Sequence, residues 1–121
     1  MQEKRQFVRL DVNVKVNWEK IVGEAPEPSE KENVSRNISE GGICLIVYEQ
    51  LGVGEKIKLD IELPSQKKIA ATGRIAWINE FAIGQVQEKR YDAGIEFLEI
   101  SPQDREEIKK FVFTLLDQKG A

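Results

Sequence analysis

Residues 10–18 read Leu-Asp-Val-Asn-Val-Lys-Val-Asn-Trp, with apolar and polar side chains in strict alternation. Successive side chains of an extended chain point to opposite faces, so the apolar side chains of this stretch share one face. This period is typical of a β-strand that has one face in a protein core and the other in water. The stretch therefore predicts a half-buried strand, and later segments of the chain must supply its partners.

Five further segments have the composition of strands. They are Val34–Ser39, Ile43–Tyr48, Lys56–Leu63, Lys68–Ile78 and Tyr91–Phe97. Gly73, inside the fourth segment, indicates a bulge or a tight bend. The charged, proline-containing residues 19–33 are expected to form a solvated loop, and residues 79–88 a loop or an extension of a hairpin.

The last part of the chain changes to a helical period. Ser101 is a good N-cap, Pro102 is a favoured first helical residue, and Asp104 completes a Ser-x-x-Asp capping pattern. Apolar residues then occur at the spacing of one helix face: Ile108, Phe111, Val112, Leu115 and Leu116. A helix is therefore expected over residues 101–118.

Together these elements indicate a mostly β protein. Strands and helices do not alternate along the chain, so a parallel sheet is not expected. A small antiparallel six-stranded β-barrel fits better, because closure removes the exposed strand edges, and the C-terminal helix would pack on it. We expect one domain over residues 1–121, with a flexible basic arm at 1–9, the barrel at 10–97 and the helix at 101–118.

The composition argues against several classes of function. The chain has no histidine and a single cysteine, Cys44. It therefore has no imidazole for general base catalysis, no serine–histidine or cysteine–histidine pair, and too few soft ligands for a zinc site. Cys44 lies in an apolar run and is expected to be a buried, inert thiol. We expect no enzyme, no bound metal and no cofactor.

The charge balance speaks against nucleic acids and membranes as partners. The formal net charge is −3, so no broad cationic field attracts a duplex or an anionic bilayer. A small barrel that binds single-stranded nucleic acid is a distant alternative, but the nine aromatic residues fall mainly in apolar positions of the pattern. The longest apolar run, residues 43–48, is too short to span a bilayer, and no leader opens the chain. A cytoplasmic protein is expected.

Positive charge is concentrated near the N-terminus, at Lys4, Arg5 and Arg9. Arg5 and Arg9 are four residues apart, which puts both side chains on one side of either an extended or a helical segment. A guanidinium stays charged, meets phosphate oxygens with two parallel N–H groups and stacks on purine rings. The alternative is an ordinary charged tail.

A second short motif occupies residues 37–42 and reads Asn-Ile-Ser-Glu-Gly-Gly. On a strand Asn37 and Ser39 share a face, and both can donate to and accept from a purine edge. Gly41 and Gly42 allow positive φ and let a ligand approach bare backbone amides. Arg36 adds a further cation. The alternative is a simple polar turn.

In this order the two motifs resemble the signature of the PilZ family, the bacterial receptor module for cyclic di-GMP. That signature is Arg-x-x-x-Arg ahead of a barrel, followed by Asp/Asn-x-Ser-x-x-Gly. Two weaker landmarks come later in register, Gly-Arg-Ile-Ala-Trp at residues 73–77 and Tyr-Asp-Ala-Gly-Ile-Glu-Phe at residues 91–97. The resemblance covers nearly the whole chain.

The resemblance implies a ligand-binding role for five residues. Arg5 and Arg9 would hold the phosphates of cyclic di-GMP and contact a guanine. Asn37 and Ser39 would hydrogen-bond a guanine edge, and Gly42 would keep that surface open. Asn37 stands where many members have aspartate, so this chain lacks the charge that best accepts from a guanine N1–H.

Four further residues are weaker candidates for the same site. Lys4, Arg36 and Gly41 adjoin the two motifs, and Trp77 could offer its ring to a guanine. Core packing is the alternative for Trp77.

The function that the resemblance implies is that of a second-messenger receptor. Ligand binding would order the arm of residues 1–9 and present a new surface to a downstream protein partner or an attached domain, in motility or biofilm regulation. The alternative is a PilZ-like protein-interaction module that does not bind the nucleotide.

Overall fold

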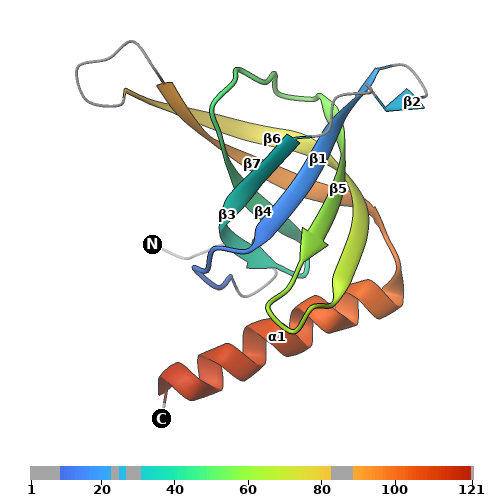
Figure 1. Cartoon of the computed structure of the whole chain (residues 1–121), viewed down its shortest axis with the longest axis vertical. Coiled ribbons are helices and arrows are strands. Elements are labelled where there is room, and N and C mark those ends of the chain that lie inside the picture. Colours follow the sequence, from blue (N-terminus) through green and yellow to red (C-terminus); the bar gives the residue numbers. More distant parts are fainter. Residues whose placement is uncertain (1–8, 23–24, 27–30, 83–88, 121) are drawn as a thin grey trace, which may run out of the picture.

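The computed structural model describes residues 9–22, 25–26, 31–82 and 89–120. These described residues form seven strands and one helix, in this order along the sequence: β1 (Lys15–Val22), β2 (Ala25–Pro26), β3 (Lys31–Ser39), β4 (Gly42–Val47), β5 (Lys56–Glu62), β6 (Lys68–Ala82), β7 (Lys89–Ile100) and α1 (Pro102–Gly120). The helix lies across one end of the sheet assembly, and the β6–β7 hairpin projects from the other end (Figure 1).

All strand pairs are antiparallel and the sheet closes on itself. The strand order is β2-β1-β3-β4-β7-β6-β5, and β1 also pairs with β5. The result is a closed six-stranded barrel, to which the two-residue β2 adds a short hairpin at the end of β1. The predicted fold class, a small antiparallel barrel with a C-terminal helix, is confirmed.

The alternation over residues 10–18 correctly predicts which side chains enter the core. Leu10, Val14, Val16 and Trp18 are buried. The regular strand nevertheless begins only at Lys15. Before it, Leu10 and Ile38 exchange two backbone hydrogen bonds of 2.9 and 3.0 Å.

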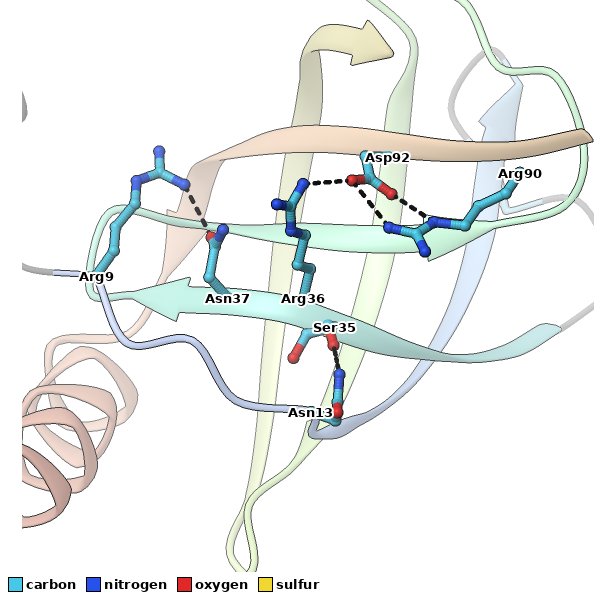
Figure 2. A network of polar contacts seen from close by, with 7 residues as sticks. All are labelled: Arg9, Asn13, Ser35, Arg36, Asn37, Arg90 and Asp92. Carbon is cyan, nitrogen blue, oxygen red and sulfur yellow. Dashed lines mark hydrogen bonds and ion pairs between the residues drawn. The ribbon is translucent and has the colours of Figure 1, made fainter. Parts of the chain in front are cut away.

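Ser35 replaces part of the missing backbone pairing ahead of β1. Its hydroxyl accepts from the Val14 amide at 3.0 Å and donates to the Val12 carbonyl at 2.7 Å. The Asn13 side-chain amide donates to the Ser35 carbonyl at 2.6 Å, as Figure 2 shows. A buried polar side chain that satisfies its own and its neighbours' hydrogen bonds stabilises this irregular entry into the barrel.

The prediction of a solvated loop over residues 19–33 is wrong at both ends of that range. β1 continues to Val22, and β3 begins at Lys31. The Trp18 indole N–H donates to the Asn33 side-chain oxygen at 2.9 Å across these two strands. Backbone pairing continues here because the ladder needs no apolar side chains on a face that meets water. At residues 79–82 the chain extends the β6–β7 hairpin, one of the two forms expected there.

The helix begins as its capping pattern predicts. The Ser101 hydroxyl accepts from the Asp104 amide at 3.0 Å, and the Asp104 carboxylate accepts from the Ala70 amide of β6 at 3.4 Å. Ile108 and Val112 are buried against the barrel. Within the ranges that the structure describes, no helix has both the length and the apolar character to cross a membrane.

Candidate functional site

Asn37, the first residue of the second motif, lies on the outer face of the barrel in a row that crosses four adjacent strands. One row across β3, β4, β7 and β6 consists of Asn37, Cys44, Gly94 and Trp77. The neighbouring row consists of Ile38, Ile43, Ile95 and Ile75, which are all buried. Because side chains alternate between the faces of a strand, the row that contains Asn37 and Trp77 points outward.

Two β-bulges bring this row to the outside. On β3 the register shifts between Ser35 and Asn37, and on β6 it shifts between Ile75 and Trp77. At each bulge the strand has one residue more than its partner strand. The residues after the bulge therefore face the side opposite to the one that uninterrupted alternation would give them. Ser35 and Ile75 are therefore buried, while Asn37 and Trp77, two residues further on, face out.

The two motifs touch each other in the structure. Arg9 Nη1 donates a hydrogen bond to Asn37 Oδ1 at 3.0 Å, from the segment ahead of β1 to the C-terminal part of β3 (Figure 2). The end of the first motif thus lies beside the start of the second. The predicted residues Lys4 and Arg5 lie outside the described residues.

Ser39, Gly41 and Gly42 form the turn between β3 and β4. The buried Ser39 hydroxyl accepts from the Gly41 amide at 3.2 Å and donates to the Gly42 carbonyl at 3.4 Å, so it closes the turn. A Cβ atom at Gly42 would collide with the backbone carbonyl of Ile95. Gly42 is needed for this close approach rather than for positive φ, which among the described glycines only Gly54 adopts.

Trp77 lies on the outer surface, so the alternative of core packing does not hold for it. Its indole covers Gly94, where an added Cβ would meet the ring, and 38% of the residue is exposed. A flat aromatic surface thus lies in the same row as Asn37. Such a ring can stack with a planar ligand.

Arg36, Arg90 and Asp92 form a polar cluster, of which sequence reasoning had missed Arg90 and Asp92. Arg36 Nη1 donates to Asp92 Oδ2 at 2.8 Å. Arg90 donates to the same carboxylate twice, from Nε at 3.1 Å and from Nη2 at 3.3 Å. Arg90 and Asp92 flank the apolar Tyr91, and a spacing of two puts both side chains on the outer face of a strand. This pattern is the sequence feature that could have identified them.

Cys44 is buried beneath this cluster, as expected. Burial, and secondarily the Asp92 carboxylate, raises the pKa of the Cys44 thiol to about 11, whereas Arg36, Arg9 and Arg90 oppose the rise. All three arginines therefore lie close enough to act on the same thiol. The outer face here combines three guanidiniums, one amide and one aromatic ring.

The pKa of Cys44 predicts a pH dependence of stability. Because the pKa of the thiol is higher in the folded protein than its ordinary value of 9.0, ionisation favours the unfolded chain. The free energy of unfolding should fall as the pH rises from about 9 to about 11, and less so in Cys44→Ala. Urea titrations of both proteins across this range check the difference, and parallel curves would contradict it.

Among the described residues, His, Cys, Asp and Glu form no group of three that could hold a metal ion. The outer face offers charge, hydrogen bonds and a stacking surface. These are the elements that recognise a planar anion.

A model of the PilZ domain family matches residues 3–114. The chain belongs to the PilZ family. The match includes both motifs and most of α1, and it agrees with the barrel topology described above.

Several solved PilZ-fold structures resemble this chain. The Bacillus subtilis inhibitor of motility (MotI/DgrA) is 23% identical, with a TM-score of 0.75 over 98% of this chain and 53% of that chain. The PilZ domain of Escherichia coli YcgR, solved with cyclic di-GMP, is 15% identical, with a TM-score of 0.74 over 97% and 95%. The K. pneumonia MrkH–cyclic di-GMP complex is 16% identical, with a TM-score of 0.74 over 98% and 55%.

At these identities the similarity shows a common PilZ fold. This chain spans about half the length of the MotI/DgrA and MrkH chains that it matches. The comparison with curated proteins gave no match.

Proposed function

We propose that this PilZ domain is a cyclic di-GMP receptor and that the ligand binds on the outer face of β3, β4, β7 and β6. The observation that carries the proposal is the contact of Arg9 with Asn37, which joins the two motifs on one surface. Support comes from the family and from YcgR and MrkH, whose structures contain cyclic di-GMP. A receptor needs no catalytic group, and we propose no reaction.

The Arg9–Asn37 contact indicates how both residues exchange hydrogen-bond partners when the ligand binds. Guanine N1–H and its exocyclic amine are donors, so they replace Arg9 as the partners of the Asn37 oxygen. Arg9 is then released to a ligand phosphate, where a charge-assisted hydrogen bond is stronger than its bond to a neutral amide. The exposed face of Trp77 stacks on a guanine.

Ser39 supports the same site from the turn. Its bond to the Gly42 carbonyl is 3.4 Å long, which is weak for a hydroxyl donor. A guanine acceptor can take this proton while the Gly41 amide still donates to the hydroxyl oxygen. Ser39 thus contributes to the turn and to the ligand at once.

Arg9 is the last residue of the arm of residues 1–9, so its release from Asn37 couples ligand binding to the conformation of the arm. Ordering a backbone residue costs about 1–2 kcal/mol, whereas each charge-assisted hydrogen bond returns roughly 1.5–3 kcal/mol. Several such bonds, from Arg5 and Arg9 together, are needed to order the arm. The ordered arm then signals to a protein partner or an attached domain in the bacterial cytoplasm, in motility or biofilm control, which fits a relative named as an inhibitor of motility.

Isothermal titration calorimetry with cyclic di-GMP tests this function, with cyclic di-AMP and GTP as controls. We expect binding of cyclic di-GMP alone, weakening as ionic strength rises because phosphate contacts are screened. Absence of heat with all three nucleotides would overturn the proposal and favour an interaction module that does not bind the nucleotide.

Trp77 provides an optical test of the stacking contact. Of the two tryptophans, Trp18 is buried and hydrogen-bonded to Asn33, whereas Trp77 is exposed beside the site. Cyclic di-GMP should therefore quench the emission of wild-type protein, and the change should be lost in Trp77→Phe. Equal quenching in wild type and Trp77→Phe would mean that the ring does not contact the ligand.

A further inference from the structure

Asp92 is a charged residue without exposed surface on the outer side of a barrel. Its side chain is 0% exposed, covered by Arg36 and Arg90. Burial of a carboxylate is unfavourable unless hydrogen bonds and opposite charges compensate it. A second carboxylate–arginine pair, Glu96 with Arg74, spans β7 and β6 on the same outer face but is about half exposed on both sides. Asp92 is therefore a fully buried carboxylate, whereas Glu96 is an exposed surface carboxylate with the same type of partner.

The carboxylate fixes the orientation of both arginines. Two bonds from one edge of Arg90 hold its guanidinium in a defined plane, and Arg90 Cζ lies 5.3 Å from the centre of the Phe81 ring. Arg36 reaches Oδ2 of the same carboxylate from β3. A guanidinium held in this way loses less rotamer freedom when it binds a second anion.

The bonds to Asp92 leave donors on the outer side. They use Nη1 of Arg36 and Nε and Nη2 of Arg90, while each guanidinium has five N–H groups. The side chains of Arg36 and Arg90 remain 55% and 36% exposed. Two cations against one carboxylate leave a net positive charge here.

This cluster adjoins the proposed ligand site. Arg36 precedes Asn37, and the side chains of Arg9, Asn37, Arg36, Asp92 and Arg90 all lie on one side of β3, β4 and β7 (Figure 2). A ligand that contacts Asn37 therefore has Arg9 on one side and Arg36 on the other. A compact ligand with two phosphates can use cations on both sides.

We propose that Arg36 and Arg90 form a second phosphate subsite on this face, for one phosphate of the cyclic dinucleotide, and that Asp92 is its positioning residue. The proposal rests on the proposed function and adds two arginines that the two motifs do not contain. Arg9 and Arg5 then serve the other phosphate.

The test compares matched variants by calorimetry with cyclic di-GMP at several salt concentrations. Arg36→Gln and Arg90→Gln each remove a cation, Asp92→Asn keeps the shape of the positioning residue without its charge, and thermal unfolding without ligand reports on the fold. Arg74→Gln and Glu96→Gln are the controls, because they change the exposed pair on the same face.

Arg36→Gln and Arg90→Gln should each weaken binding at least fivefold and make binding less sensitive to salt, because a screened contact between a cation and the phosphate is lost. Asp92→Asn should weaken binding several-fold, but it should add little loss in the Arg36→Gln/Arg90→Gln background, since Asp92 acts through these two arginines. Both controls should stay within twofold of wild type.

Four results would overturn the subsite. If the wild type binds, and Arg36→Gln and Arg90→Gln bind as tightly as the control Arg74→Gln, the proposed function stands but the subsite does not. If Arg36→Gln and Arg90→Gln bind more weakly but with the same dependence on salt, the loss comes from a change in the fold. If Asp92→Asn binds more tightly, the Asp92 carboxylate competes with the ligand for the arginines. Absence of binding by the wild type would remove the proposed function and the subsite together.

Discussion

Replacing Arg9 with alanine should weaken cyclic di-GMP binding at least tenfold and reduce the free energy of unfolding of the ligand-free protein by only about 1 kcal/mol. Without ligand Arg9 makes one hydrogen bond, to a neutral amide at a partly buried site, and such a bond contributes about 0.5–1.5 kcal/mol. With ligand it makes a charge-assisted bond to phosphate, worth roughly 1.5–3 kcal/mol, and 1.4 kcal/mol corresponds to a factor of ten. Calorimetry and thermal unfolding measure the two effects separately.

Arg74→Ala is the control for this prediction, because Arg74 also lies on the outer face and pairs with a carboxylate, Glu96. It should bind like wild type. The same tenfold loss is expected for Arg5→Ala, which tests the other end of the first motif. If Arg5→Ala and Arg9→Ala both retain wild-type affinity, the cationic arm is not part of the site.

Gly42→Ala should reduce the free energy of unfolding by about 1–3 kcal/mol or more even without ligand. The new Cβ would collide with the backbone carbonyl of Ile95, in a ladder where Gly42 pairs with Glu96 and Ile43 with Ile95. Backbone in two paired strands cannot move away as a flexible side chain can. The glycine of the second motif would thus be required by the barrel itself, and its loss would abolish binding indirectly.

Gly52→Ala is the matched control for the glycine prediction. There the added Cβ would meet only Glu55 Oε1, at 3.1 Å, which is the end of a flexible exposed side chain. Its effect should stay within about 0.5 kcal/mol. Urea unfolding of both variants decides, and a Gly42→Ala protein as stable as Gly52→Ala would disprove the packing argument.

Periodicity was sufficient to predict the fold because most strands carry an apolar face. It failed at residues 19–22 and 31–33, where β1 and β3 continue with charged side chains. The two motifs can be located in the sequence, but the contact of Arg9 with Asn37 cannot, since it joins residues 28 positions apart.

Two features of the site required the three-dimensional structure. Arg36 and Asp92 are 56 positions apart and meet only because β3, β4 and β7 are neighbours in the closed sheet. Trp77 is two residues beyond the buried Ile75, so regular alternation would place it inside, and the bulge between them reverses this. Neither a long-range pairing nor the position of a bulge can be read from local periodicity.

The bulges on β3 and β6 have a consequence for how the family can vary in length. Deleting a single residue, Arg36 or Ala76, would restore a regular ladder in which Asn37 directly follows Ser35, or Trp77 directly follows Ile75, and every later side chain of that strand would keep its present face. Asn37 would still lie opposite Cys44, and Trp77 opposite Gly94, on the outer face. The outer row that contains Asn37 and Trp77 can therefore survive a one-residue deletion at either of these two positions.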